Sequence, residues 1–416
     1  MSGDSDSETS PKTRTPEGEP ARPVWPDLGP KPGFIVREYL REHLPVYREL
    51  CDIKTEGWNN EEGDKYFEKR RNQSDKPDNK TKKGLFSLMR TIAFEIHKTT
   101  SALTINRSHH PPHSILDLCM APGGFTLAAL NCNPSAWVAA ITLPRNLGGH
   151  DIMLRKGWWS TDIRAQTVVD FRDITFLAEE MGVPLSSIPA DHPDAALFSA
   201  DRPFDGEQFD IVFCDGQVLR AHKRGQHRER TEAPRLTTSQ LVLALQRIRP
   251  GGTLIMLMHR ADSWRSVKTI HAFSQFSDTV QLYKPKSGHQ LRSSFYMVAK
   301  GVKPRRKDAL EAVERWKAHW REKTFGVVGG GEEEDEGKWK VFRAEGVRRA
   351  EEVLGEFGGE LVRMVGPVFA TQAEGLRNAS WMRSGKGGQS KAGVEKGGMR
   401  GGERGDEKGG EEKGVL

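Results

Sequence analysis

Short apolar runs alternate with amphipathic segments through the middle of this 416-residue chain. Continuous short apolar runs are typical of buried strands, whereas apolar residues three and four positions apart are typical of helices. The runs predict strands at 114–118, 137–144, 167–173, 209–216, 249–258 and 294–300, with a helix around 238–248 before the fifth strand. Strands that alternate with helical segments predict an α/β fold with a Rossmann-like, doubly wound, mostly parallel sheet.

The junction between the first predicted strand and the helix that follows carries an Ala-Pro-Gly-Gly turn at 121–124. Pro122 fixes φ, while Gly123 and Gly124 permit a backbone path that a β-carbon would obstruct. A ligand can then lie against the main chain at a helix N-terminus, where unpaired N–H groups meet polar groups. Such a turn suits a nucleotide-like cofactor, although many strand-to-helix corners carry Gly-Gly only for packing.

Two acids come directly at the ends of predicted strands: Asp173 after the third and Asp215 after the fourth. Ligands of doubly wound sheets bind outside the carboxyl ends of the strands, so both acids are expected at one site. Asp173 has a second interpretation, as the N-cap of a helix that begins at Ile174. Asp170 is expected to point away, because strand residues alternate between faces.

These segments together resemble the FtsJ-type methyltransferases, which are S-adenosylmethionine-dependent RNA ribose 2′-O-methyltransferases. The resemblance spans residues 84–303 and rests on the turn with its flanks (117–126), Asp-Phe-Arg-Asp (170–173), the Asp215 strand, Pro-Gly-Gly (250–252) and the closing segment 284–301. It implies the class I methyltransferase fold, S-adenosyl-L-methionine as cofactor and RNA as partner.

The resemblance also implies roles for individual residues. The turn would lie beside the methionine part of the cofactor, with Asp117 at the end of the preceding strand. Its residues are Ala121, Pro122, Gly123, Gly124 and Phe125. Asp173 would accept a hydrogen bond from the adenine amino group. Asp215 would be the catalytic residue nearest to the transferring methyl group.

The catalytic set of the family is Lys-Asp-Lys-Glu, and this chain keeps only the aspartate. Ser87, Leu257 and Ser294 stand where the resemblance places the first lysine, the second lysine and the glutamate. Ile141 and Thr142 stand where an acid for the cofactor ribose is expected. A ribose hydroxyl must lose its proton as it attacks, and a nearby lysine favours the developing alkoxide. That help must come from other residues here.

Four basic residues are candidates for this help. His259 and Arg260 follow the fifth strand, and Lys284 and Lys286 precede the last one. The imidazole of His259 titrates in a range suited to catalytic proton transfer. Its alternative interpretation is a polar residue that caps the end of a strand.

Two functions therefore remain open from the sequence. The first is a divergent methyltransferase that binds S-adenosyl-L-methionine and methylates RNA, which the intact turn and Asp173 favour. The second is a catalytically inactive methyltransferase-like module with a binding or regulatory role, which the missing lysines and glutamate favour.

A basic loop follows the strand-end acid Asp215 and strengthens the expectation of RNA. The chain has 63 Lys and Arg against 57 Asp and Glu, a net charge of +6. Several of the basic residues gather at 220–230, where Arg220, Lys223 and Arg224 are candidates for phosphate contacts. A solvated surface loop without a ligand is the other interpretation.

Composition and periodicity together predict five regions along the chain. Residues 1–30 are expected to be a disordered tail, 31–110 a helical extension, 111–303 the methyltransferase domain, 304–380 a second helical extension and 381–416 a disordered Gly/Lys/Glu tail. Between the two apolar parts of the first extension, 59–83 is expected to be a solvated helix plus a loop. The second extension is expected to dock on the core or on a protein partner.

Metal and membrane sites are not expected. His109, His110 and His113 share a Pro-containing loop, which is more often incidental than a ligand set. No apolar run is long enough to span a bilayer. The four cysteines form no Cys-x-x-Cys pair and are typical of reduced thiols, so a cytoplasmic or nuclear location is expected.

Overall fold

The computed structural model describes residues 31–58, 60–75, 79–105, 112–162, 164–326 and 335–384. The predicted tail 1–30 lies outside the described residues. The predicted tail 381–416 begins within helix α10 (Ser380–Ser384), and its remainder, 385–416, also lies outside them. His109 and His110 belong to another undescribed segment.

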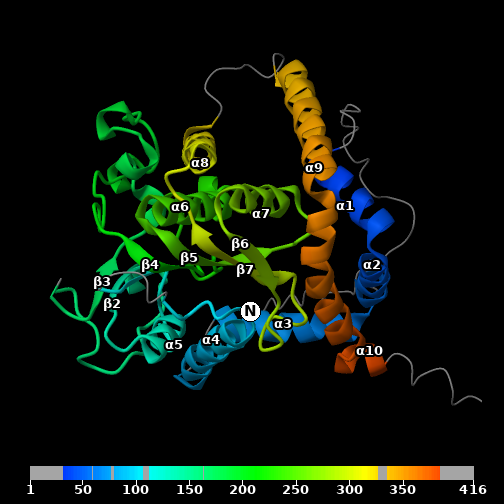
Figure 1. The fold of residues 1–416 in the computed structure, drawn as a ribbon, viewed down its shortest axis with the longest axis horizontal. Coiled ribbons are helices and arrows are strands. Elements are labelled where there is room, and N and C mark those ends of the chain that lie inside the picture. Colours follow the sequence, from blue (N-terminus) through cyan, green and yellow to red (C-terminus); the bar gives the residue numbers. More distant parts are fainter. Residues whose placement is uncertain are drawn as a thin grey trace, which may run out of the picture.

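Within the described part of the chain, seven strands form one sheet in the order β3-β2-β1-β4-β5-β7-β6 (Figure 1). The strands are β1 (Ser114–Leu118), β2 (Trp137–Thr142), β3 (Thr167–Phe171), β4 (Phe209–Cys214), β5 (Ile248–His259), β6 (Thr279–Tyr283) and β7 (Ser294–Val302). The first five pair in parallel, and β7 runs antiparallel to both of its neighbours. The predicted doubly wound, mostly parallel sheet is confirmed.

The sequence did not predict β6. Its residues Thr-Val-Gln-Leu-Tyr mix polar and apolar side chains and remain partly exposed at the edge of the sheet. A strand of this kind lacks the continuous apolar run by which buried strands are recognised.

Helices cover both faces of the sheet because the strands carry apolar residues on both sides. Neighbouring residues of a strand, such as Ile115 and Leu116 or Phe213 and Cys214, enter two different apolar clusters. On one face lie α4 (Asn79–Thr100) and α5 (Gly124–Cys132). On the other lie α6 (Glu232–Arg247), α7 (Trp264–Phe276) and α8 (Lys307–Phe325), as Figure 1 shows.

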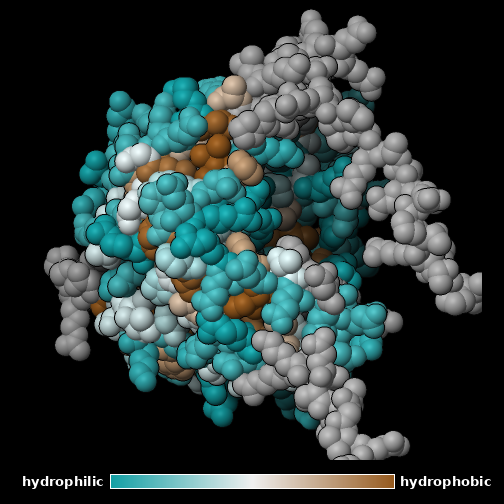
Figure 2. Space-filling model, turned by 90° about the vertical axis from the view of Figure 1, so that its right-hand side faces the viewer, coloured by the Kyte–Doolittle hydropathy of each residue, from teal (hydrophilic) through white to brown (hydrophobic). Residues whose placement is uncertain are grey.

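Helices from the two ends of the chain pack together beside α7 and β6. They are α1 (Pro32–His43), α2 (Pro45–Trp58) and the long α9 (Asp335–Arg377), while α3 (Glu61–Asp75) contacts α2 and α10. The rings of Tyr47 and Phe369 lie 4.8 Å apart, and both residues belong to the same apolar cluster as α7. The second extension therefore docks on the core of its own chain. Figure 2 views the molecule from this side, where the surface that is not drawn grey is mainly hydrophilic with small apolar patches.

Helix α4 packs closely on the glycine turn. A β-carbon at Gly124 would lie 2.6 Å from the β-carbon of Met89 and from the main-chain oxygen of Phe86. Both of these atoms belong to the backbone region of α4, so neither can move away alone. The absence of a side chain at position 124 thus sets how near α4 lies to the carboxyl end of β1.

We expect Gly124→Ala to lower the free energy of unfolding by about 1–3 kcal/mol, the usual cost of overpacking a filled interface. Gly84→Ala, also on α4, is the matched control, because a β-carbon there would meet no atom within 4 Å. That change should be neutral or stabilising, since alanine favours helix over glycine. Urea denaturation measures both variants, and equal losses would contradict the proposed contact.

Candidate functional site

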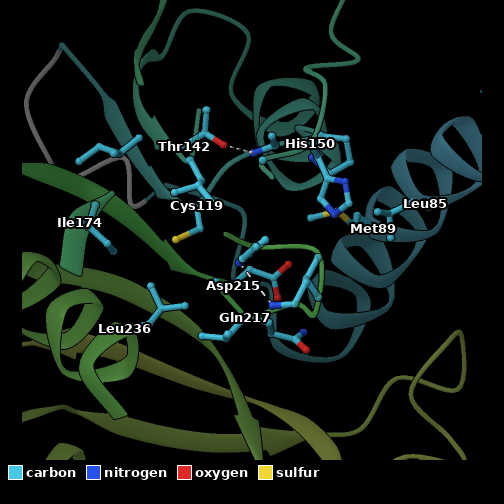
Figure 3. A pocket seen from close by; sticks show the side chains of 18 of the residues that line it. Leu85, Met89, Cys119, Thr142, His150, Ile174, Asp215, Gln217 and Leu236 are labelled. Carbon is cyan, nitrogen blue, oxygen red and sulfur yellow. Dashed lines mark hydrogen bonds between the residues drawn. The ribbon is translucent and has the colours of Figure 1, made fainter. Parts of the chain in front are cut away.

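A cavity of about 490 Å³ lies at the carboxyl ends of β1 to β4, with α4 as one wall (Figure 3). Its lining comes from the segments 119–122, 141–150, 172–175 and 215–223, together with α4, the first turns of α6 and the segment 288–296 that leads into β7. Cavities of this size are typical of sites for small molecules and cofactors. Its place in the sheet is the one that doubly wound folds use for ligands.

Asp215 lies in the middle of this cavity, with Leu85 and Met89 on one side and Ile174 and Leu236 on the other (Figure 3). The hydroxyl of Tyr296 donates a hydrogen bond of 2.7 Å to the carboxylate of Asp215. Burial raises the pKa of Asp215 to about 7, although the Tyr296 hydrogen bond acts to lower it. A carboxyl group with this pKa can hold or release a proton near neutral pH.

Asp173 caps a short helix and also lines the cavity. Its carboxylate caps the short 3₁₀ helix Ile174–Phe176 by accepting hydrogen bonds from the amide and hydroxyl of Thr175, at 2.9 and 2.8 Å. The same residue lines the cavity. Asp170 lies in an ion pair of 2.5 Å with Arg172 and is not among the lining residues.

The predicted cofactor turn is divided between the cavity and the core. Ala121 and Pro122 line the cavity, whereas Asp117 and the residues 123–125 do not. Gly123 has a φ of +99°, Gly124 meets α4, and Phe125 is buried in the core. Asp117 is buried behind the turn and accepts a hydrogen bond of 2.5 Å from the hydroxyl of Thr126. Its carboxylate thereby ties α5 to β1, and burial raises its pKa to about 7.

Two loops meet above the cavity. The amide of Lys223, after β4, donates a hydrogen bond of 2.9 Å to the carbonyl of Leu147, after β2. Gly148, with a φ of +95°, approaches so closely that a β-carbon would lie 2.4 Å from the carbonyl oxygen of Ala221. His150 and His222 come from these loops and line the cavity. Burial, aided by His150, lowers the pKa of His222 to about 4, so His222 is neutral at physiological pH.

The sequence model of the family described as "FtsJ-like methyltransferase" matches residues 95–302, which is half of the chain. The chain belongs to the FtsJ-like methyltransferase family. The expected resemblance is confirmed, and with it the methyltransferase class of this fold.

Solved methyltransferase structures show only distant similarity to this chain. A ribosomal RNA methyltransferase from Plasmodium falciparum is 18% identical with a TM-score of 0.32, covering 51% of this chain and 96% of that one. TrmN from Thermus thermophilus is 15% identical with a TM-score of 0.31, covering 52% of each chain. Human Methyltransferase-like protein 13, solved in complex with SAH, is 12% identical with a TM-score of 0.32, covering 57% of this chain and 96% of that one. No curated protein matches the sequence.

This member of the FtsJ-like family carries no lysine at the two positions where the resemblance places one. Ser87 is exposed on α4 and is not among the residues that line the cavity. Leu257 is buried in the apolar core, opposite Tyr296 in the pairing of β5 with β7. Lys82 does line the cavity, and its ammonium group is held by Asp151 at 2.9 Å. At the end of β2, the hydroxyl of Thr142 accepts a hydrogen bond of 3.2 Å from the amide of Ala121.

The candidate replacements for the lysines lie outside the cavity lining. His259 is exposed at the end of β5. Lys284 is buried, and its ammonium donates to the carbonyls of Arg292 and Ser294 at 2.5 and 2.8 Å. Burial lowers the pKa of Lys284 to about 7. Lys286 faces away and pairs with Glu374 of α9 at 3.3 Å.

The basic loop contributes unequally to the site. Lys223 lines the cavity, and Arg220 is exposed beside it. Arg224 braces the loop instead: its guanidinium donates to Glu229 at 2.6 and 2.9 Å and to the carbonyl of Leu219 at 2.9 Å. Of the three predicted phosphate contacts, Arg224 is therefore already engaged within the protein.

Sequence reasoning missed His289, which lines the cavity beside Asp215. Its Nδ1 lies 2.6 Å from the hydroxyl oxygen of Ser294, and its ring packs edge-on against Tyr296 at 5.5 Å. Burial lowers its pKa to about 3, which keeps the imidazole neutral. The alternation of β7 could have indicated Tyr296, but His289 lies in a loop without any periodic pattern.

A search of the described residues for three or more clustered His, Cys, Asp or Glu side chains finds no group suited to a metal ion. Among the same residues, no helix has the length and apolar character needed to cross a bilayer.

We expect Asp215→Asn to change the pH dependence of folding. Between 3.8 and about 7, folded wild-type protein holds a proton on Asp215 that the unfolded chain has released, so rising pH lowers the free energy of unfolding. The wild type should therefore lose stability relative to Asp215→Asn by up to about 1.4 kcal/mol per pH unit across this window. His222 and His289 have lowered pKa values, so their titration makes the free energy of unfolding rise with pH. Because wild type and variant share this contribution, the difference between them isolates Asp215.

Urea denaturation at several pH values gives this difference directly. Asp162→Asn is the control, because Asp162 lies in an exposed loop and pairs with Arg164, which lowers its pKa. A constant difference between wild type and Asp215→Asn from pH 4 to pH 7 would contradict the raised pKa.

Proposed function

We propose that this protein transfers a methyl group from S-adenosyl-L-methionine to RNA, at a ribose 2′-hydroxyl. The observation that carries the proposal is that Asp173 and Asp215 line one cavity with the Ala121–Pro122 turn, at the carboxyl ends of parallel strands. Membership of the FtsJ-like family makes methyl transfer the expected chemistry. The identity of the acceptor rests on the motif resemblance and on the basic loop.

The residues of the cavity fit such a cofactor. Asp173 offers a carboxylate for the adenine amino group, and Ile174 and Leu236 offer apolar contacts for its ring. Gly216 brings the main chain close to the site, since a β-carbon there would lie 2.5 Å from Cys119 Sγ. The ribose hydroxyls would find Thr142 in place of the acid that the resemblance places at the end of β2.

When bound, S-adenosyl-L-methionine would supply a methyl group on a positively charged sulfur, which departs as a neutral thioether. The protein must position the acceptor oxygen and take its proton. Asp215 suits the second role, because its pKa of about 7 allows a carboxylate to form at neutral pH and still accept a proton. Tyr296 fixes the orientation of that carboxylate through its hydrogen bond of 2.7 Å. A base of this kind would replace the lysine that the family uses.

Two observations support RNA as the acceptor. Lys223 stands at the wall of the cavity, and Arg220 is exposed beside it. Cations at the entrance of a catalytic site are the expected footprint of phosphate contacts.

The alternative function, a catalytically inactive methyltransferase-like binding module, has one specific observation in its favour. Leu257, which stands where the resemblance places a catalytic lysine, is apolar and buried in the core, so this position of β5 supplies no cation near Asp215. A binding module would retain affinity for the cofactor or RNA without any turnover. The two experiments below separate these functions.

Calorimetric titration of S-adenosyl-L-methionine into the full chain should show saturable binding. Asp173→Ala should weaken it about tenfold or more, because hydrogen bonds that involve a charged group typically contribute about 1.5–3 kcal/mol. Asp173→Asn keeps a hydrogen-bond acceptor for the amide of Thr175 but removes the negative charge. Comparing the two variants therefore separates the effect of losing the charge from the effect of losing the helix cap. Asp162→Ala is the control. A folded protein that binds no cofactor would exclude methyl transfer.

Transfer of a labelled methyl group to RNA pools tests catalysis. We expect incorporation into RNA but not into DNA of the same sequence, since only RNA has the 2′-hydroxyl. Asp215→Asn should reduce transfer at least a hundredfold while cofactor binding persists, because general base catalysis typically contributes about 10²–10⁴-fold. Cofactor binding by the wild type without transfer to any acceptor would instead support the inactive module.

A further inference from the structure

Helix α2 is fixed next to the site by a buried hydrogen bond. The hydroxyl of Tyr47 donates to the carboxylate of Asp262 at 3.0 Å, and both residues are buried. Asp262 belongs to the loop between β5 and α7, which follows the carboxyl end of β5. This contact holds α2 against the loop at the carboxyl end of β5, which is the same end of the sheet as the cavity.

Lys54 lies on the same face of α2 as Tyr47. The two residues are seven positions apart, which is two helical turns. Lys54 is half-buried, and within the described part of the chain it makes no ion pair shorter than 4.0 Å. Burial lowers the pKa of Lys54, with Asp262 and Arg260 among the charges that act on it. Lys54 therefore lies on the face of α2 that contacts the β5–α7 loop through Tyr47.

Arg260 and Arg292 stand on two adjoining segments of the same region. The amide of Arg260 donates a hydrogen bond of 2.9 Å to the carbonyl of Ser293, the residue after Arg292. Arg260 has a φ of +55°, a conformation that is uncommon for a residue with a side chain and that often marks functional sites. Its side chain is 58% exposed. Arg292 lines the cavity, so these two segments connect the cavity to the loop that Tyr47 of α2 contacts.

The region carries more positive than negative charge. Asp262 lies 3.7 Å from the guanidinium of Arg260 and also accepts the Tyr47 hydrogen bond. Lys284 is buried beneath the same segment, with its ammonium bound only to main-chain carbonyls in the contacts described above. Burial and then Lys54 lower the pKa of Lys284, which indicates that these cations repel one another. An anion that bound among them would relieve this repulsion.

We propose that Lys54, Arg260 and Arg292 bind a backbone phosphate of the RNA acceptor at the mouth of the cavity. The proposal rests on RNA as the acceptor in the proposed function. Arginine forks and a lysine point charge are the groups that proteins use to hold phosphate. A phosphate at this place would position the neighbouring nucleotide beside Asp215. Helix α2 lies outside the family match at 95–302, so the first extension supplies a part of the acceptor site that the family domain lacks.

Fluorescence anisotropy of a labelled single-stranded RNA with the full-length protein tests the site across a salt titration. We expect Lys54→Gln and Arg260→Gln each to weaken binding several-fold at low salt. Each should also reduce the slope of log affinity against log salt, by at most about 0.7, which is the full contribution of one phosphate contact on a single strand. Calorimetry should show unchanged cofactor binding in both variants, which demonstrates that the fold persists.

Lys65→Gln and Lys307→Gln are matched controls that remove the same charge elsewhere. Lys65 is exposed on α3 and pairs with Glu62, and Lys307 is 88% exposed at the start of α8. Both should leave the salt slope unchanged. Equal losses in controls and test variants, or test variants that bind RNA like the wild type, would overturn the phosphate site. Absence of RNA binding by a wild type that binds the cofactor would overturn it as well.

The outcomes also separate this site from the proposed function. Loss of RNA affinity in the two test variants alone, in a protein that does not bind S-adenosyl-L-methionine, would support the phosphate site and overturn methyl transfer. Normal RNA binding by both test variants in an active methyltransferase would overturn the phosphate site and support methyl transfer.

Discussion

Helix α4 can reach the carboxyl end of β1 only because residue 124 has no side chain, and this approach shapes the cavity. The helix brings Leu85 and Met89 to one wall, opposite Ile174 and Leu236 on the other. Asp215 is left between two apolar walls, and its pKa rises as a result. Gly124 thus permits the close packing of α4, and the electrostatics of the site follow from that packing.

Burial governs the titrating groups around Asp215 more than charge pairing does. The pKa values of Asp215 and Asp117 are raised and those of His222 and His289 are lowered, in each case chiefly by loss of solvent. Burial therefore favours the neutral forms of these four groups. A buried site of this kind has less need of a lysine to assist proton transfer than a polar site has. The pKa of its carboxyl group already lies near neutral pH.

Sequence could predict those parts of the molecule that follow from periodicity and strand ends. Asp173 and Asp215 are predictable because both stand at the ends of predicted strands, and parallel strands bring their carboxyl ends together. Strand β6 was missed because its polar and apolar residues mix at the edge of the sheet. His289 and Arg292 belong to a loop, whose path depends on tertiary contacts such as the Lys284 hydrogen bonds to main-chain carbonyls. Lys284 and Lys286 lie only two residues apart, yet one is buried and the other pairs with α9, which no local pattern distinguishes.

The packing of α9 on α1 and α2 also has a consequence for the order in which the molecule can be completed. The ribosome makes α1 and α2 before the strands of the sheet and α9 after them. Apolar side chains such as Tyr47 and Leu50 can therefore meet their partners on α9 only after the sheet segment has been synthesised. The sheet can assemble before that point, but the packing around α2 is completed only once α9 has emerged.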